Sequence, residues 1–342
     1  MGEPKLIDPI VAEEINKMKH GLRRTEFDGM SVLITGGAGF IGSWLCDLLI
    51  SMNSEVACLD DLSTSTTRNV DHLIGKRGFK FINTDVGDYK AMNEFDYIMH
   101  LASHASPEVY QKKPIETLRA NSLGSINVAE LARKKDATVL FASTSEVYGD
   151  AQVVPTPESY WGNVNPIGPR SCYDEGKRFG EALFTAYHKQ YGLDVRIARI
   201  FNTFGPRLRE DGSYGRAMSR FIMQALTHKP ITLYGDGEQT RSFCYITDTA
   251  TGLMLLTMNE KARGEAVNIG NSHEITILYL AKKIKELTRS RSELTFHPLP
   301  IDDPKRRSPR ITKAWTLLKW RPRTNLEEGL RKTISWFQKK ER

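Results

Sequence analysis

The sequence has no long hydrophobic run, few cysteines and no secretory leader pattern. Its longest apolar stretches, such as SVLITGGAGFIG, fall far short of the roughly 18 residues that cross a membrane. Residues 1–27 alternate charged and apolar groups and lack the continuous apolar core of a secretory signal. Four scattered cysteines form no CxxC pair with zinc-ligand spacing, which argues against a metal site. These absences predict a soluble protein of the reducing cytoplasm with no membrane contact.

Low-complexity segments and internal repeats are also missing, and what remains has the composition of a globular protein. The net charge of +7 is concentrated toward the C-terminus, for example in Lys305-Arg306-Arg307. A nucleic-acid-binding protein would be expected to add aromatic stacking motifs or a recognition helix to such a cluster, and neither is visible. We therefore expect no nucleic-acid partner, and a basic face that meets solvent or a polyanionic small molecule.

Apolar, β-branched segments alternate with amphipathic helices over the first two thirds of the chain. The predicted strands are residues 31–35, 55–60, 79–85, 97–102, 138–144 and 195–202, and the predicted helices among them are 43–52, 123–135 and 174–190. Strands alternating with helices are typical of an α/β fold with a doubly wound parallel sheet that helices cover on both faces.

The alternation weakens beyond residue 200, where shorter elements predict a smaller, mixed α/β lobe. Two short strands are expected around the Gly-Asp-Gly turn at 235–237, and helices over 277–288 and 326–340. We divide the chain into an N-terminal extension with one amphipathic helix (1–29), a dinucleotide-binding unit (30–200) and a substrate lobe (201–342). Segments of the last part are expected to interleave with the second.

A glycine-rich turn lies between the first strand and its helix. Gly36, Gly39 and Gly42 have the spacing of a dinucleotide-binding turn, where glycine lets the backbone approach a pyrophosphate at a helix N-terminus. Asp60 ends the next strand, and a carboxylate there accepts hydrogen bonds from the adenosine ribose and repels a 2′-phosphate. Asp61 adds a second negative charge. The pattern predicts a Rossmann-type unit that binds NAD rather than NADP.

A YxxxK pair provides a candidate acid–base group. Tyr173 and Lys177 are four residues apart on one predicted helix and therefore share a face. A neighbouring ammonium favours the phenolate, so we expect Lys177 to make Tyr173 a usable base near neutral pH. Thr144, Ser145 and Glu146 follow the fifth predicted strand, at the sheet edge where ligands bind in such folds.

These motifs carry a family resemblance. GGAGFIG, HLAS, NSLGSINV, STSEVYG, YDEGK, RIFNTFGPR, YGDGEQTRSFCYITD and NIGN, spread over about residues 30–337, resemble the extended short-chain dehydrogenases/reductases of the nucleotide-sugar epimerase and dehydratase group. Residues 160–178, 105–110 and 302–307 are most similar to the branch that decarboxylates UDP-glucuronate. The resemblance implies a tightly bound, catalytic NAD, conversion of UDP-glucuronate to UDP-xylose, and a homodimer. The helices at 123–135 and 174–190 are our candidates for its interface, with packing of their apolar residues only within the monomer as the alternative.

The resemblance also implies roles for the catalytic candidates. Tyr173 takes the proton of the sugar 4-hydroxyl as hydride passes to NAD, while Lys177 tunes the phenol and holds the nicotinamide ribose. The resulting 4-ketone makes the sugar carboxylate a β-keto acid, which loses carbon dioxide unaided. Glu146 and Ser145 order the water that reprotonates the enolate, and Thr144 hydrogen-bonds near the 4-oxygen. Ser145 stands where a 4,6-dehydratase carries the Asp that expels water.

Binding roles are carried over by position. The expected cofactor-binding residues are Gly36, Gly39, Phe40, Ile41, Gly42, Asp60, Asp85, Val86, Leu101, Ala102, Ser103, Tyr173 and Lys177. The expected substrate-binding residues are Tyr110, Glu146, Arg170, Asn202, Arg216, Tyr234, Arg241 and Arg307, whose arginines suit phosphate and carboxylate groups.

The sequence departs from the branch at three places. His104 stands where the decarboxylases usually have Pro, the loop LSTSTTRN (62–69) lacks the usual Gly-Arg, and Arg310 replaces an acidic residue. These changes leave room for a different uronate or nucleotide. We expect His104 either to alter how the sugar carboxylate is met or to be a neutral loop residue. Three alternatives therefore stay open: a UDP-sugar 4-epimerase, a 4,6-dehydratase, and a catalytically silent NAD-binding relative.

Overall fold

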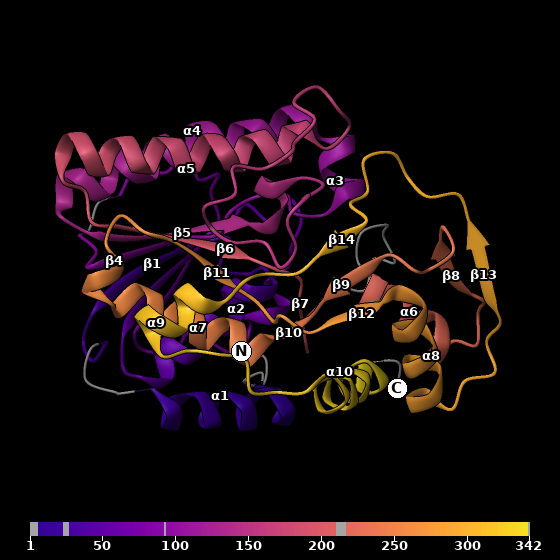
Figure 1. Cartoon of the computed structure of the whole chain (residues 1–342). Helices are drawn as coiled ribbons and strands as arrows, with labels where there is room; N and C mark the ends of the chain where they lie inside the picture. The colour runs from indigo at the N-terminus through magenta and orange to yellow at the C-terminus, as the bar shows by residue number, and fades with distance from the viewer. Residues whose placement is uncertain (1–5, 23–26, 92–93, 210–216, 341–342) are drawn as a thin grey trace.

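The computed structural model describes residues 6–22, 27–91, 94–209 and 217–340, and Figure 1 shows their arrangement. The helices are α1 Pro9–Gly21, α2 Phe40–Ser51, α3 Pro107–Lys112, α4 Pro114–Lys135, α5 Ser171–Tyr191, α6 Ala217–Leu226, α7 Ile246–Met258, α8 Ile277–Thr288, α9 Thr312–Leu318 and α10 Leu326–Lys340. The strands are β1 Ser31–Thr35, β2 Glu55–Leu59, β3 Phe79–Ile82, β4 Tyr97–His100, β5 Thr138–Thr144, β6 Val195–Ile200, β7 Thr203–Phe204, β8 Ile231–Tyr234, β9 Thr240–Ser242, β10 Cys244–Tyr245, β11 Ala266–Ile269, β12 Glu274–Thr276, β13 Leu294–His297 and β14 Arg306–Arg307.

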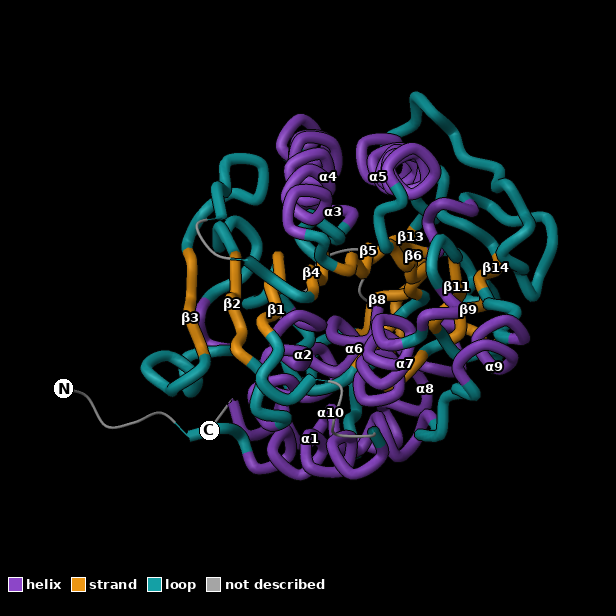
Figure 2. The backbone as a smooth tube through the Cα atoms, turned by 90° about the vertical axis from the view of Figure 1, so that its left-hand side faces the viewer, coloured by secondary structure: helices purple, strands orange, loops and turns teal. Residues whose placement is uncertain are grey.

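A seven-stranded parallel sheet forms the centre of the molecule. Its strand order is β11-β6-β5-β4-β1-β2-β3, and all of its pairs are parallel. In the end-on view, α3, α4 and α5 cover one face, and α2 and α7 lie on the other (Figure 2). Strands β1, β5 and β6 are buried on both faces, as their β-branched sequences require. The prediction of a Rossmann-type doubly wound sheet is confirmed.

The strand order reverses direction next to β1, since β2 and β3 lie on one side of it and β4, β5 and β6 on the other. In an open α/β sheet, ligands bind outside the carboxyl ends of the strands at such a switch point. The glycine-rich turn follows β1, and the Thr144-Ser145-Glu146 segment follows β5. The topology therefore brings both predicted motifs to the same edge of the sheet.

The second half of the chain builds several small sheets and also returns to the large one. Strands β8 and β9 lie on either side of the Gly-Asp-Gly turn, as expected, but each pairs elsewhere: β8 with β13, and β9 with β12 and β14. Strand β11 pairs with β6 at the edge of the central sheet. Interleaving of this kind was expected, and the boundary at residues 200/201 stays a prediction.

The N-terminal extension holds the predicted amphipathic helix. Asp8 caps α1 by accepting hydrogen bonds from the amides of Ile10 and Val11, and Val11, Ile15 and Met18 are buried against α2 and α7.

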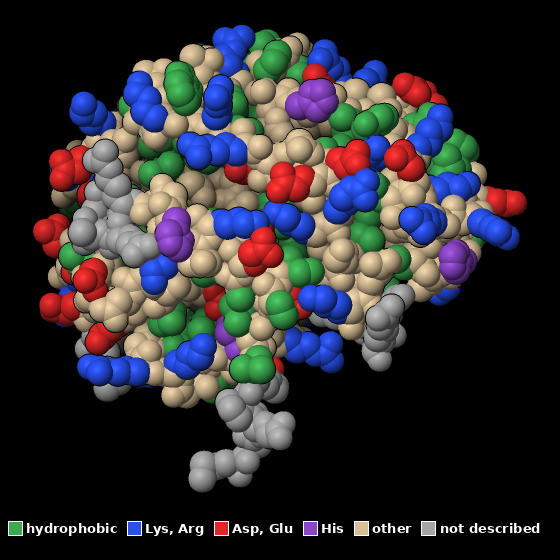
Figure 3. Space-filling model, turned by 90° about the horizontal axis from the view of Figure 1, so that it is seen from below, with side chains coloured by type: hydrophobic (Ala, Val, Ile, Leu, Met, Phe, Trp, Pro, Cys, Tyr) green, Lys and Arg blue, Asp and Glu red, His purple; other side chains and the backbone are tan. Residues whose placement is uncertain are grey.

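Lys and Arg side chains on the face seen from below are interspersed with acidic and hydrophobic ones (Figure 3). Within the described residues, no helix is long and apolar enough to cross a membrane, and no three His, Cys, Asp or Glu side chains group as metal ligands.

Candidate active site

The glycine turn between β1 and α2 leaves no room for side chains. Gly36 has a φ of +69°, and a Cβ there would lie 2.9 Å from the backbone of Ala102. A Cβ on Gly42 would strike the carbonyl oxygen of Gly36. Gly39 is the N-terminal cap of α2, so the free amides of the first helical turn face the sheet edge. This is the cradle that a dinucleotide pyrophosphate needs.

Asp60, directly after β2, connects this turn to the segment that follows. Its carboxylate accepts hydrogen bonds from the amide of Ala38 at 3.0 Å, from the amide of Leu62 at 2.9 Å and from the hydroxyl of Ser65 at 2.7 Å. Burial raises the pKa of Asp60, against the effect of these donors. The carboxylate is therefore fixed in orientation beside the turn, at the position expected to meet an adenosine ribose.

Tyr173 and Lys177 project from α5 toward the end of β5. The Lys177 ammonium donates to the carbonyl of Ala142 at 2.8 Å and lies 6.0 Å from the centre of the Tyr173 ring. Burial lowers the pKa of Lys177 to about 7. Tyr110 stacks on the Tyr173 ring, with ring centres 5.3 Å apart, and fixes the plane of the phenol.

Lys177 is expected to lower the pKa of Tyr173, but burial has the larger effect on this pKa in the protein without ligands. Burial raises the pKa of Tyr173 well above its ordinary value, and only the Thr144 hydroxyl and the more distant Arg307 act in the opposite direction. The phenol is thus held protonated next to Thr144. The spacing correctly predicted that Tyr173 and Lys177 share a face, but it contained no information on how deeply both are buried.

Glu146 lies between two arginines. Arg307 donates to both of its carboxylate oxygens at 2.6 and 2.7 Å, and Arg170 donates to one of them at 2.6 Å. All three side chains are nearly buried. Burial by itself would raise the pKa of Glu146, but the two guanidinium groups outweigh it and lower that pKa to about 2. Glu146 is therefore ionised at every physiological pH.

Two further carboxylates complete this charged end of the site. Asp303 pairs with Arg241 at 3.0 Å and lies 3.6 Å from Arg170. Asp174 is buried, and one of its oxygens meets no hydrogen-bond donor among the described residues. Burial and the charge of Glu146 raise the pKa of Asp174 to about 8, although Arg170 opposes them. The cluster carries several cations in a cleft, which suits an anionic ligand.

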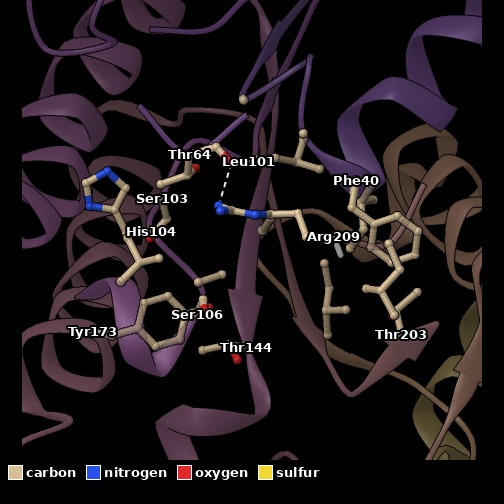
Figure 4. Close-up of a pocket in the computed structure, with 18 of the residues that line it drawn as sticks. Phe40, Thr64, Leu101, Ser103, His104, Ser106, Thr144, Tyr173, Thr203 and Arg209 are labelled. Atoms are coloured by element: carbon tan, nitrogen blue, oxygen red, sulfur yellow. Dashed lines mark hydrogen bonds between the residues drawn. The ribbon is translucent and has the colours of Figure 1, made fainter. Parts of the chain in front are cut away.

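One cavity of about 680 Å³ joins the glycine turn, the tyrosine–lysine pair and the arginine cluster. Figure 4 shows Tyr173 and Thr144 at one side of it, Ser103 and His104 beyond them, and Phe40 and Thr203 opposite. The cavity is lined by the predicted residues Gly36, Gly39, Phe40, Ile41, Gly42, Asp60, Asp85, Val86, Leu101, Ala102, Ser103, Thr144, Ser145, Glu146, Arg170, Tyr173, Lys177, Asn202, Tyr234, Arg241 and Arg307.

Two predicted substrate-binding residues are not seen at the cavity wall, each for a different reason. Tyr110 is buried behind Tyr173 and is not among the residues that line the cavity, because its ring is covered by the phenol that it stacks on. The structure shows its contact with Tyr173, and its expected role near the sugar stays a prediction. Arg216 lies outside the described residues.

The structure also adds residues that the sequence did not single out. Arg209 and Asp303 line the cavity, and Asp303 holds Arg241 in place. Asp303 belongs to the motif at 302–307, in which the sequence predicted a binding role only for Arg307. Arg209 comes from the connection after β7, and no local pattern indicates that it reaches a loop of the other half. His104 does not approach the arginine cluster; its hydrogen-bond partners are Ser63 and Thr117.

The turn and the cavity fit NAD. The cradle at Gly36 and Gly42 excludes side chains, Asp60 is oriented beside it, and the buried hydroxyl of Ser103, which lines the same cavity, meets no hydrogen-bond partner among the described residues. An additional polar ligand is what such a hydroxyl requires.

Comparison with known proteins gives the same result. The sequence pattern of the NAD dependent epimerase/dehydratase family matches residues 32–270. The UDP-glucuronic acid decarboxylase 1 of Xenopus tropicalis is 50% identical over 315 residues, 92% of this chain and 74% of that protein. The UDP-glucuronic acid decarboxylase 5 of Arabidopsis thaliana is 46% identical and covers 90% of both chains.

Among solved structures, the UDP-glucuronic acid 4-epimerase of Bacillus cereus, in complex with UDP-glucuronic acid and NAD, superposes with a TM-score of 0.82. It is 30% identical, and the match covers 91% of this chain and 99% of that one. Sequence pattern, fold and the cradle around Gly36 thus agree: the chain belongs to the NAD dependent epimerase/dehydratase family, and NAD is its cofactor.

Proposed function

We propose that this protein is an NAD-dependent decarboxylase that converts UDP-glucuronate to UDP-xylose. The observation that carries the proposal is the carboxylate of Glu146, held between Arg170 and Arg307 at the end of β5 beside Tyr173. A simple 4-epimerase has no need of a carboxylate at this point, and a 4,6-dehydratase needs a second acid where this chain has Ser145. Relatives named UDP-glucuronic acid decarboxylase support the same choice.

The first step is carried by α5 and the end of β5. Tyr173, beside Thr144, is positioned to take the proton of the sugar 4-hydroxyl. Because burial holds the phenol protonated in the protein without ligands, it can act as a base only when the positive charges of bound NAD and of Lys177 favour the phenolate. Burial lowers the pKa of Lys177 to about 7. Its amine can therefore gain or lose a proton within the physiological pH range, which adds or removes a positive charge next to the phenol. Bound NAD supplies the reversible oxidation at carbon 4.

The second step needs little help from the protein. A 4-ketone places the sugar carboxylate β to a carbonyl, and such an acid loses carbon dioxide without an added acid. The chain then has to deliver a proton to carbon 5. Because Glu146 stays ionised, it acts as a hydrogen-bond acceptor that orients a water molecule together with Ser145, and is itself no proton donor.

Arginines hold the anionic substrate during these steps. Arg241 and Arg307 are placed for the diphosphate and Arg170 for the uronate end, with Asn202 and Tyr234 along the same cavity. Asp303 accepts a hydrogen bond from Arg241 at 3.0 Å and so helps to hold this guanidinium at the wall of the cavity.

The deciding experiment is mass spectrometry of the purified protein incubated with UDP-glucuronate and no added NAD. We expect a product lighter than the substrate by one carbon dioxide, and its formation without added cofactor shows that NAD co-purifies. An isomer of unchanged mass would establish an epimerase instead, and loss of one water a dehydratase. No product even with NAD supplied would favour the catalytically silent relative.

Replacing the proposed base provides the mechanistic test. Tyr173→Phe keeps the ring that stacks on Tyr110 but removes the hydroxyl, so we expect turnover to fall by about 10²–10⁴-fold while NAD remains bound. Tyr191→Phe, at the exposed end of the same helix, is the matched control and should retain full activity. Equal activity of the two variants would assign the base to another residue.

We include in the proposal a cytoplasmic homodimer with neither nucleic acid nor membrane as a partner. Exposed large apolar side chains on the outer helix pair include Leu118, Leu123 and Ile126 on α4, and Phe179 on α5. Helices α4 and α5 pack side by side over one face of the sheet (Figures 1 and 2). Several exposed apolar side chains on one pair of packed helices favour association with a second copy.

A further inference from the structure

The segment that follows Asp60 forms one wall of the cavity. Asp61, Ser63, Thr64, Ser65 and Thr66 all line it, on the side of the glycine turn and away from the arginine cluster. We call residues 61–66 the strap. Asp60 accepts hydrogen bonds from Leu62 and Ser65 of the strap. Two side chains from more distant parts of the chain also bind the strap: His104 from the loop after β4, and Arg209 from the connection after β7 (Figure 4).

His104 bridges the strap to α4. Its Nε2 atom lies 3.1 Å from the hydroxyl of Ser63, and its Nδ1 atom lies 3.0 Å from the hydroxyl of Thr117. The side chain is buried, with 6% of its surface exposed. An imidazole fixed at both nitrogens cannot rotate without breaking one of the two contacts, so the strap is tied to the start of α4.

The protons of these two hydroxyl groups are already committed. Thr117 donates to the carbonyl of Lys113 at 2.7 Å, and Ser63 donates to the carboxylate of Asp61 at 2.6 Å. Each hydroxyl has one proton, so toward His104 both can only accept. All four hydrogen bonds are therefore satisfied only when both ring nitrogens carry protons. A neutral His104 has to give up one of its contacts, or the Ser63 proton has to leave Asp61.

Arg209 holds the strap from the opposite side. Its guanidinium donates to the backbone carbonyl of Thr64 at 2.5 Å. This bond joins the second half of the chain to the first, across the cavity that also contains Leu101 and Phe40 (Figure 4). Thr64 and Arg209 both line the cavity, so this bond fixes the strap to the second half of the chain at the cavity wall.

We propose that His104 and Arg209 are positioning residues that hold the strap closed over the adenosine half of NAD and thereby slow the exchange of the cofactor. Neither residue touches the reacting atoms. The cofactor of this reaction is restored at the end of each cycle, so an enzyme that retains it loses nothing. The proposal rests on NAD binding and does not depend on which sugar is the substrate.

A dependence on pH follows from the proton count. The charged groups that act on His104 are Asp61 on the strap, Asp85 after β3, Lys113 before α4 and Glu116 in its first turn. Burial lowers the pKa of His104, and Asp61 opposes burial most strongly. Protonation completes the hydrogen bonds of the strap, so NAD exchange should become slower as the pH falls through this pKa.

The test measures exchange of the bound cofactor rather than activity. The purified holoprotein is mixed with an excess of isotopically labelled NAD, free nucleotide is removed at intervals, and the ratio of labelled to unlabelled NAD is read by mass spectrometry. His104→Ala and Arg209→Ala each remove one tie, so we expect exchange to accelerate by about 2- to 10-fold for each, the size of one net hydrogen bond. Arg291→Ala, an exposed arginine away from the cavity, is the control.

A conservative variant distinguishes a tie from general destabilisation. His104→Gln keeps a donor and an acceptor but cannot titrate, so its exchange should be slower than that of His104→Ala and should not change between mildly acidic and mildly alkaline pH. Unchanged exchange in both alanine variants would overturn the proposal, as would the same pH dependence in His104→Gln as in the wild type. Because no UDP-sugar is used, a failed decarboxylase assay leaves this result intact.

Discussion

At the scale of single residues, the site contains buried carboxylates whose negative charges are compensated by neighbouring arginines. Glu146 stays ionised because two arginines surround it, and the same carboxylate then helps to keep its neighbour Asp174 protonated. Removing either arginine would leave Glu146 partly uncompensated in a buried place, which typically costs about 3–5 kcal/mol. Each arginine is therefore needed to compensate the buried carboxylate of Glu146.

Asp174 should make stability depend on pH. Its pKa is about 8 in the folded protein against an ordinary value of 3.8, so the folded state holds one more proton than the unfolded state between these values. The free energy of unfolding should accordingly fall as the pH rises from about 4 to about 8. Asp174→Asn removes this contribution, and thermal unfolding across that range should show a flatter profile.

Asp88→Asn, an exposed aspartate on the loop after β3, is the control and should keep the wild-type pH profile. If Asp174→Asn kept the wild-type dependence of the free energy of unfolding on pH, a group other than Asp174 would be the one that takes up the proton.

Many residues of the candidate site could be predicted from the sequence, and those that could not be predicted share one cause. Tyr173, Lys177 and Glu146 are recognisable because their motifs are continuous in the sequence. Arg209 and Asp303 are not, because each acts on a residue far away in the chain, Thr64 and Arg241 respectively. Degree of burial, which sets the pKa values of Tyr173 and Lys177, likewise depends on the complete fold.

At the scale of elements, the connection from β1 to α2 depends on close packing of backbone against backbone. A side chain at Gly42 would collide with the Gly36 carbonyl. We expect Gly42→Ala to lower the free energy of unfolding by about 1–3 kcal/mol and to abolish co-purification of NAD. Thermal unfolding and mass spectrometry of the denatured protein measure the two effects.

Gly21→Ala serves as the comparison, since a Cβ at the end of α1 meets no atom within 4 Å. It should leave NAD bound and stability unchanged or slightly higher. Retention of NAD by Gly42→Ala would mean that the turn can move away from the added methyl group.

Elements with a strong pattern were predicted well, and those set by tertiary pairing were not. Helices α8 and α10 begin and end where the sequence indicated. Helix α4 begins at Pro114, well before the predicted start at residue 123. The prediction missed these first turns because their buried positions are Thr117 and Asn121, which are polar. The four residues of β11 gain strand geometry only beside β6, and nothing in so short a segment indicates this partner.

At the scale of the whole molecule, the exposed apolar side chains of α4 and α5 predict the assembly. Leu123→Glu together with Phe179→Glu places charges in the proposed contact, so we expect a monomer where the wild type is a dimer. Light scattering after size-exclusion chromatography measures the change. Leu299→Glu, an exposed leucine on the loop after β13, should remain dimeric. A monomeric wild type would show that this face has no second copy as its partner.

The pairing of β11 with β6 also bears on how the polypeptide is made. Strand β6 ends at Ile200, but its neighbour is not synthesised until Ile269. During translation, the growing chain therefore carries an open sheet edge of unpaired backbone groups, the feature through which nascent chains aggregate. Contacts between segments so far apart in sequence also form slowly. The exposure of β6 should therefore end only after residues 266–269 have been synthesised and can pair with it, when most of the chain has already been made.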